Sequence, residues 1–406
     1  MARPGVNQNN TSKGPGHRGT NQSGMRAYNE RLILSLIRAH GSLAKADIAK
    51  RTGLSAQTIS VIIRELEADG LLLRGEPVRG KVGQPLVPMA LNPEGAYFYG
   101  LKVGRRSAQL VLIDLLGEIR DMAGITYRYP TPGSIREFAS EATDRIAADL
   151  SPAARARIAG MGVALPFQLW NWADSVGASR EDRDAWRHAD LRADIAATLD
   201  IPVYLQNDAT AACGAELAFG QTHSAGDFVY FYIGSFIGGG VVLNGRLYSG
   251  RSGNAGALGS MPVARTGEPV CQLIDLASLT SLENELLAKG QDCAWIWESP
   301  QDWGELNQNV MDWLDRAGQA IAYAIVSSTA VIDFGAAILD GWIPATIRQQ
   351  LVASTRRHIS EFDLDGLNVP VVQEGSIGIH ARAIGGASLP LSERFLIGPI
   401  ELQGGN

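Results

Sequence analysis

The chain of 406 residues lacks any run of about 18 apolar residues, so no segment has the length and composition of a membrane-spanning helix. Its first residues also lack the apolar core that is typical of a signal peptide. Only three cysteines occur, widely spaced and in no metal-like pair: Cys213, Cys271 and Cys293. We therefore expect a cytoplasmic protein with reduced thiols. The six histidines are scattered and offer no catalytic pair.

Basic residues are concentrated in the first quarter of the chain. Residues 1–90 contain 13 lysines and arginines against 6 acidic residues, a net charge of +7. Residues 91–406 contain 23 lysines and arginines against 36 acidic residues, a net charge of −13. The overall charge of −6 is the sum of these two unequal parts. Basic surfaces attract nucleic-acid phosphates through counterion release, whereas an acidic body is kept off the duplex. The distribution indicates a basic DNA reader joined to an acidic body.

The first 24 residues are rich in asparagine, glycine, serine and glutamine, and they include Arg3, Lys13 and Arg18. A segment of this composition cannot bury enough apolar surface to fold alone. We expect residues 1–24 to form a flexible basic arm.

Residues 26–70 have the pattern of a helix-turn-helix. Apolar residues recur at helical spacing in the first part, and Gly41 follows where a C-cap glycine is expected. A shorter helical segment runs from Leu43 to Gly53, and Ser55 then stands at the N-cap of a third helix that runs to Gly70. Two short helices joined by such a turn place the second of them in a DNA major groove.

The third helix is expected to have an apolar face and a polar face. The core that it forms with the preceding helix is predicted to contain Ile48, Leu54, Ile59, Ile62, Ile63 and Leu66. The polar residues are candidates for contacts with bases and phosphates: Ser55, Gln57, Thr58, Ser60 and Arg64.

Residues 71–91 alternate apolar stretches with a tip that contains glycine and basic residues, as a two-stranded wing does. Arg79, Lys81 and Gln84 lie at that tip and are further DNA-binding candidates. The alternative is a solvated hairpin with ordinary surface charges, but the basic charge of the whole segment favours a wing.

The remaining residues repeat one arrangement of strands and helices. Residues 96–122 read as two antiparallel strands that turn at 104–107, followed by a third strand after Gly117. A second set of strand, glycine-rich turn and strand begins at Phe228. Together with the intervening helices, the repeated hairpin is the organisation of the actin-like, ribonuclease H-like sugar-kinase fold. The predicted fold class is therefore α/β, an N-terminal winged helix-turn-helix followed by a two-lobed body.

Three segments carry a specific resemblance to a known family: VYLQNDATAACGAELAFG, IGSFIGGGVVLNGRLYSGRSGNAGALGSMPV and, near the end, ARAIGGASL. In this order, behind a winged helix, the chain resembles the ROK family, named for repressors, open reading frames and sugar kinases. The resemblance covers nearly the entire chain after residue 25. In members with a DNA-binding domain it implies transcriptional regulation, with a sugar or sugar derivative as effector between the lobes.

The resemblance also implies a division of the chain and a set of partners. We expect a winged helix at 25–91, a first lobe at 92–205 that is completed by about 380–406, and a second lobe at 206–379. Helix-turn-helix readers usually bind two half-sites about 34 Å apart. The expected assembly is a homodimer or homotetramer on operator DNA, with a sugar effector and no membrane partner.

Departures from the kinase motifs indicate which branch of the family this is. The kinases carry Asp-x-Gly-Gly-Thr in the first hairpin, whereas here Lys102 replaces the carboxylate and Arg105 and Arg106 crowd the turn. Phe236 replaces the first glycine of the second phosphate turn. These changes predict that kinase activity is lost, with no catalytic residue and no cofactor. The rival hypotheses are a sugar kinase with a DNA-binding arm and a scaffold without a ligand.

The candidate effector residues come from the same resemblance. Asp208 matches the general base of the kinases, but it can equally accept sugar hydroxyls or, with Asn207, cap the following helix. Trp170 and Asn171 follow LPFQ where the family places residues between the lobes, and they suit either sugar stacking, a hydrophobic lid or a dimer contact. Asn254, in the glycine-rich stretch, completes the set.

Two further motifs of the family are missing. Its Glu-x-Gly-His is replaced at 257–260 by Ala-Leu-Gly-Ser, and of its zinc cysteines only Cys271 remains, so we expect no metal. The glycines at 238–240 have no phosphate to bind and are expected to let the hairpin turn tightly under a helix.

Overall fold

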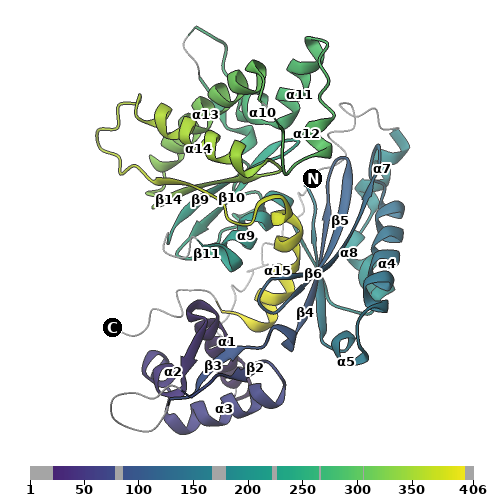
Figure 1. Cartoon of the computed structure of the whole chain (residues 1–406), viewed down its shortest axis with the longest axis vertical. Coiled ribbons are helices and arrows are strands. Elements are labelled where there is room, and N and C mark those ends of the chain that lie inside the picture. The colour runs from purple at the N-terminus through teal and green to yellow at the C-terminus, as the bar shows by residue number, and fades with distance from the viewer. Residues whose placement is uncertain are drawn as a thin grey trace, which may run out of the picture.

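The computed structural model describes residues 22–77, 86–166, 180–221, 226–264, 267–304 and 306–397. They form a small, mainly helical part at one end of the molecule and two larger parts, each built on a β-sheet (Figure 1). No helix in these ranges is both long and apolar enough to cross a membrane. Residues 1–21 of the expected arm lie outside the described residues. Its last three residues, 22–24, belong to the first helix.

The small part contains the three predicted helices and a three-stranded antiparallel sheet in the order β1-β3-β2. Its elements are α1 (Gln22–His40), β1 (Ser42–Ala44), α2 (Lys45–Thr52), α3 (Ala56–Ala68), β2 (Leu72–Arg74) and β3 (Pro88–Leu91). The pairing of β2 with β3 confirms a two-stranded wing. The assignment of Leu43 and Ala44 to the second helix is wrong, because they form β1 and pair with β3.

Local sequence signals set the helix ends of this part. Gly41 and Gly53 have left-handed backbones, with φ of 71° and 69°, which glycine adopts without a steric penalty. Ser55 is the N-cap of α3, and its hydroxyl accepts a hydrogen bond from the Thr58 backbone nitrogen at 3.1 Å. Leu54 of the predicted core is half-buried. The other five predicted core residues are buried: Ile48, Ile59, Ile62, Ile63 and Leu66.

The first large part is built on a five-stranded sheet in the order β6-β5-β4-β7-β8. Its strands are β4 (Tyr97–Val103), β5 (Ser107–Asp114), β6 (Ile119–Thr126), β7 (Ile158–Ala164) and β8 (Val203–Gln206). The first three are antiparallel, and β7 and β8 join them in parallel. Apolar residues of α4 (Pro132–Ala148) and α8 (Leu191–Leu199) pack on the sheet. Shorter helices are α5 (Pro152–Arg155) and α7 (Arg180–His188).

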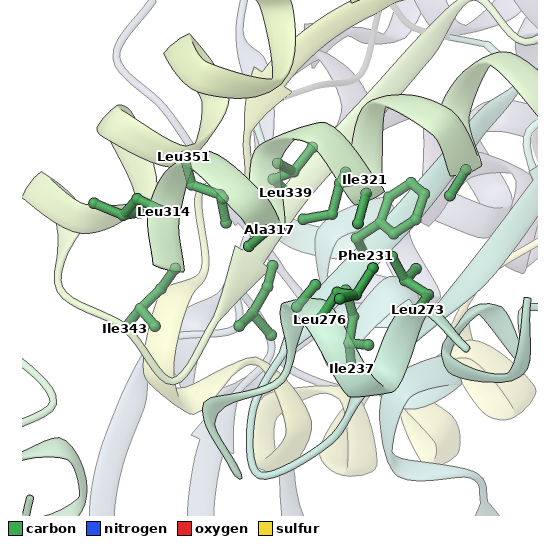
Figure 2. Packing of buried hydrophobic residues seen from close by; sticks show 14 of the residues in the cluster. Phe231, Ile237, Leu273, Leu276, Leu314, Ala317, Ile321, Leu339, Ile343 and Leu351 are labelled. Carbon is green, nitrogen blue, oxygen red and sulfur yellow. The ribbon is translucent and has the colours of Figure 1, made fainter. Parts of the chain in front are cut away.

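The second large part repeats this topology in a sheet of order β11-β10-β9-β14-β15. Its strands are β9 (Phe228–Ile233), β10 (Ile237–Leu243), β11 (Arg246–Leu247), β14 (Ala336–Gly341) and β15 (Val371–Glu374). Its main helices are α10 (Leu273–Ala277), α11 (Leu279–Ala288), α12 (Trp295–Glu298), α13 (Gln308–Thr329) and α14 (Ala345–Ile359). Figure 2 shows Phe231 and Leu339 of the sheet packed with Ile321 of α13. The repeat inferred from the two hairpins is confirmed.

Two helices occupy the centre of the molecule, α9 (Asp208–Phe219) and α15 (Ala381–Phe395). They pack against each other, α9 also on β10 and α15 also on β4 and β7 (Figure 1). Buried residues of α1 and α3 belong to the same hydrophobic cluster as Phe98 of β4 and Phe395 of α15. The helix-turn-helix part, hereafter the reader, therefore packs directly on the body. For the body we propose the lobes 92–205, completed by 380–406, and 206–379.

Candidate functional site

Two candidate effector residues stand at the start of α9. The Asn207 side-chain oxygen accepts hydrogen bonds from the backbone nitrogens of Ala209 and Thr210, both at 3.1 Å, so Asn207 is the N-cap of the helix. Asp208 Oδ2 accepts a hydrogen bond from Arg382 Nη1 at 3.1 Å. The Asp208 and Arg382 side chains are 14% and 13% exposed, so this is a nearly buried ion pair between α9 and α15.

Arg382 is the residue here that sequence reasoning missed. Its guanidinium carbon lies 4.8 Å from the ring centroid of Tyr232 on β9. Arg382 Nε and the Tyr232 hydroxyl are both buried, and the interactions of Arg382 with Tyr232 and Asp208 outweigh that burial and raise the pKa of Arg382. A signal was present, because Arg382 is the one charged residue in ARAIGGASL, and helices of small apolar residues usually pack on several sides.

Lys102, in place of the kinases' carboxylate, is buried near this ion pair. It lies on β4, is 6% exposed, and donates hydrogen bonds to Ser107 Oγ at 2.9 Å and to the Ser107 carbonyl at 3.1 Å. Its Nζ is 5.7 Å from the ring centroid of Trp342, which follows β14 in the other lobe. Burial lowers the pKa of Lys102 well below its usual range, Arg382 lowers it further, and Asp208 acts in the opposite direction.

The two turns that depart from the kinase motifs are linked across the lobes by side chains. Arg106 Nη2 donates to both carboxylate oxygens of Glu283 on α11, at 2.8 and 2.9 Å. Trp297 Nε1 donates to Glu283 Oε1 at 2.9 Å, and the Arg106 guanidinium lies 4.8 Å from the Trp297 ring centroid. The Arg105 guanidinium lies 5.6 Å from the ring centroid of Phe236. We call these five residues the interlobe clasp.

The glycines at 238–240 lie inside β10 and not in its turn, which is closed by a hydrogen bond from Gly234 to Phe236. A Cβ on Gly240 would stand 2.4 Å from the Cβ of Cys213, and one on Gly238 2.9 Å from the Cβ of Ala209. Both neighbours are on α9. The tight turn is wrong, but the helix expected over these glycines is present: Gly238 and Gly240 let α9 pack directly on the strand.

Of the other effector candidates of the body, the structure describes Asn254. Asn254 is exposed on the loop before the short 3-10 helix Leu258–Ser260. Trp170 and Asn171 lie outside the described residues. Cys271 is half-buried on a two-residue strand, Cys271–Gln272. In the described ranges no three histidine, cysteine or acidic side chains group as metal ligands do, and the absence of zinc stays a prediction.

The exposed side of α3 is the candidate DNA interface. This helix lies at the end of the molecule away from the two lobes (Figure 1). Gln57 and Arg64 are exposed, Ser60 is half-buried, and the half-buried Thr58 hydroxyl lies 2.9 Å from that of Ser55. The wing residues Arg79, Lys81 and Gln84 lie outside the described residues.

Sequence reasoning missed Val61, which is 44% exposed on the same helix. It stands three and four residues away from Arg64 and Gln57, so it lies on their face. An exposed valine beside polar residues on a recognition helix has the chemistry to contact a thymine methyl group.

Arg38, near the end of α1, joins the reader to both lobes. Its guanidinium donates to the Ala218 carbonyl of α9 at 3.1 and 3.2 Å and to the Leu115 carbonyl after β5 at 2.8 Å. It also lies 4.5 Å from the ring centroid of Phe219. Burial lowers the pKa of Arg38 to about 10, and Asp114 acts in the opposite direction.

A cavity of about 1430 Å³ lies beside Arg38, between the reader and the body. Its lining comes from α1, β3, β8, the C-terminal half of α9, the loop between β10 and β11, and the end of α15. Neither Asp208 nor Lys102 contributes to it, so it is separate from the place to which the kinase motifs point.

Comparison with known proteins agrees with this architecture. The ROK family model matches residues 98–393, and a winged helix-turn-helix DNA-binding model matches residues 26–72. The chain therefore belongs to the ROK family. With its reader, it is a DNA-binding transcriptional regulator of that family.

Relatives and solved structures extend the likeness over most of the chain. An uncharacterized protein of Sinorhizobium fredii, y4fQ, is 26% identical over 92% of this chain and 93% of its own. The xylose repressor of Bacillus subtilis is 26% identical over 62% and 64%, so the match spans less than two thirds of that protein.

A ROK family transcriptional regulator described as a homologue of the E. coli MLC protein matches 94% of this chain and 100% of its own, with a TM-score of 0.66 and 21% identity. A ROK family glucokinase of Streptomyces griseus, solved with glucose and AMPPNP, matches 72% and 99%, with a TM-score of 0.55 and 18% identity. At these identities the likeness concerns the fold.

Proposed function

We propose that the chain is a sugar-responsive repressor that binds its effector between the lobes at Asn207 and Asp208 and has lost phosphoryl transfer. The observation that carries this proposal is the course of α9 and α15. Each helix has one end at the Asp208–Arg382 pair and the other end at helix α1 of the reader. A ligand bound at one end can therefore bias the contacts at the other.

The reader ends of these helices are tied to α1 by polar contacts. Arg38 donates to the last turn of α9, and the Arg31 guanidinium donates to the Glu393 carbonyl of α15 at 3.4 Å. The backbone nitrogen of Ile397, just after α15, donates to Ser35 Oγ at 2.9 Å. Because Arg38 contacts both lobes, a rotation of one lobe against the other must break or reorient its hydrogen bonds.

Close helix packing supports transmission along this route. A Cβ on Gly385 of α15 would stand 1.9 Å from the carbonyl oxygen of Ala211 on α9, so the two backbones touch. Glu216 of α9 accepts hydrogen bonds from the nitrogen and the hydroxyl of Ser376, both at 2.9 Å, which fixes α9 to the second lobe. Helices packed this tightly move as rigid bodies and do not absorb a displacement.

The interlobe clasp supports the loss of kinase activity. In the family resemblance the two turns admit nucleotide phosphates, whereas here Arg105 and Phe236 contact each other across them. A phosphate would have to displace this contact, and Lys102 cannot hold magnesium as a carboxylate does. Retention of Asp208 is the one feature that favours the rival proposal of a sugar kinase.

The DNA-binding part of the proposal assigns base contacts to Gln57, Val61 and Arg64 on α3 and phosphate contacts to the wing. Ser55 and Thr58 serve mainly to start the helix, because their hydroxyls pair with each other. Each base-contacting side chain is expected to contribute about 1–3 kcal/mol. Readers of this type bind two half-sites, so we propose a homodimer or homotetramer.

Selection of binding duplexes from a random pool gives an operator without knowledge of the target genes. Gln57→Ala and Arg64→Ala should then weaken operator binding and relax specificity, whereas Arg155→Ala, an exposed arginine of the first lobe, should not. Arg79→Ala with Lys81→Ala should flatten the dependence of log affinity on log salt. Unchanged operator affinity in both α3 variants would reject α3 as the recognition helix.

Arg38→Met tests the route from effector to reader. It removes the guanidinium that bridges both lobes while keeping an apolar stem against Phe219. We expect operator binding to persist and the response to effector to shrink. A variant that keeps the full response would show that coupling does not pass through Arg38.

A further inference from the structure

Lys102 and Arg382 are two buried basic side chains at the start of α9, outside the residues that the proposed function uses for sugar hydroxyls. Lys102 comes from β4 of the first lobe, and Arg382 comes from the first turn of α15. Both are close enough to Asp208 for their charges to interact with its carboxylate. In the described part of the chain, this group contains two basic side chains and one carboxylate.

The protein's own groups compensate Lys102 less fully than Arg382. The Lys102 ammonium donates hydrogen bonds to two oxygens of Ser107, and both of these oxygens are uncharged. The third hydrogen of the ammonium has only the nearby Trp342 ring. Arg382 has Tyr232 and Asp208 beside it, and these two side chains raise its pKa despite its burial, whereas Lys102 has only a share of Asp208. Charges removed from water are costly unless an opposite charge and hydrogen bonds compensate them.

We infer that the effector is an anionic polyol, whose carboxylate or phosphate binds between Lys102 and Arg382. This inference rests on the proposed function and specifies the chemistry of its ligand. An incoming anion would supply the missing negative charge, and the guanidinium fork suits either a carboxylate or a phosphate. The same substitution that removes the kinases' metal-binding carboxylate thus provides a receptor for an anion.

The arrangement also explains how such a ligand would acquire its hydroxyl contacts. Asp208 Oδ2 accepts from Arg382, and Oδ1 accepts from the Ala209 backbone nitrogen at 3.0 Å. An anion that takes over Arg382 leaves Asp208 Oδ2 available to accept a sugar hydroxyl. Because Arg382 belongs to α15 and Asp208 to α9, this exchange of partners acts on the contact between the two helices that reach the reader.

The test compares neutral and anionic ligands with the same carbon skeleton on the wild-type protein. The probes are D-xylose, D-xylonate, D-xylose 5-phosphate, D-glucose, D-gluconate and D-glucose 6-phosphate, measured by calorimetry and thermal shift at constant ionic strength. We expect an anionic probe to bind about ten- to hundredfold more tightly than its neutral parent, the effect of a charge-assisted hydrogen bond. Tighter binding of the neutral parent, or an equal thermal shift with inorganic phosphate, overturns the inference.

Matched variants then locate the binding. Lys102→Met and Arg382→Gln should each weaken binding of the tightest anionic probe about tenfold or more, while circular dichroism and a cooperative melting transition report that the variants are folded. Lys289→Met is the control, because Lys289 is an exposed lysine at the end of α11. Equal affinity in Lys102→Met and the control overturns the assignment of the anion site.

The outcomes separate this inference from the proposed function. A neutral sugar that binds and changes operator affinity supports the sugar-responsive regulator and rejects the anionic ligand. Binding of an anionic probe that leaves operator affinity unchanged supports the anion site and rejects its role as effector. If no probe binds and none changes operator affinity, both the proposed function and the anionic effector are contradicted.

Discussion

The phosphate turns and the start of α9 are both places where ROK kinases handle substrate, and in this chain they contain different kinds of side chains. At the turns, Arg105 and Arg106 cross to the other lobe and contact Phe236 and Glu283. At the start of α9, polar groups remain nearly buried, but Asp208 now pairs with Arg382. The first region has become a contact between lobes, whereas the second still has groups that can bind a ligand.

This difference teaches which part of a kinase a regulator needs. A repressor requires a ligand that stabilises one arrangement of the lobes, because a ligand shifts an equilibrium only by its differential affinity for the two states. It does not require nucleotide, metal or proton transfer. In the proposed function, the clasp blocks the nucleotide turns, and Asn207 and Asp208 lie where the two central helices begin.

The largest expected effect concerns the buried ion pair. Asp208→Ala leaves Arg382 charged, nearly buried and without its carboxylate, which should lower the free energy of unfolding by about 3–5 kcal/mol. The measurement is denaturant unfolding, with the double variant Asp208→Ala/Arg382→Met expected to regain much of the loss. A loss below about 1 kcal/mol would mean that the pair is solvated, as exposed pairs are.

A smaller effect is expected at the clasp. Glu283→Gln removes the charge that Arg106 and Trp297 share, but Arg106 is partly exposed, so solvent screens much of the interaction. We expect the free energy of unfolding to fall by about 1 kcal/mol, with operator affinity unchanged. Arg187→Gln, which removes a charge from an exposed pair on α7, is the control and should be neutral. Equal stability of the two variants would show that the clasp contributes nothing.

The smallest expected effect is the absence of a response to nucleotide. Because the clasp fills the phosphate turns, Mg-ATP at millimolar concentration should not raise the melting temperature, and no sugar-dependent ATP turnover should be detectable. Turnover that disappears on Asp208→Asn would restore the kinase proposal and end the contrast between the two regions.

Local features of this fold were predictable from sequence, whereas distant pairings were not. Ser55 and Gly53 act through neighbouring backbone, so their roles follow from residue type and spacing. The pairing of Asp208 with Arg382 joins residues 174 positions apart and depends on how α9 packs against α15. Likewise, Arg105 and Arg106 were identified as obstructing a turn, but their partners on α11 and in the turn before β10 depend on the closure of the lobes.

The misassignments have the same physical origin. Leu43 and Ala44 have helical neighbours, and only the returning strand β3 makes them a strand. The glycines at 238–240 suggest a turn from composition, yet they are required because a helix from elsewhere in the chain lies against the strand. Tertiary contacts decided each case, and a single sequence contains no direct record of them.

The most direct test of the account is operator affinity with and without the effector, compared between wild-type protein and Asp208→Asn by fluorescence anisotropy on a selected duplex. Asparagine keeps the shape of the side chain and a hydrogen-bond acceptor for Arg382, so the variant should fold and bind DNA. We expect the ligand to change the operator affinity of the wild-type protein about 5- to 150-fold and to leave that of Asp208→Asn unaffected at the same concentrations. A variant that responds to the ligand over the wild-type concentration range would contradict it.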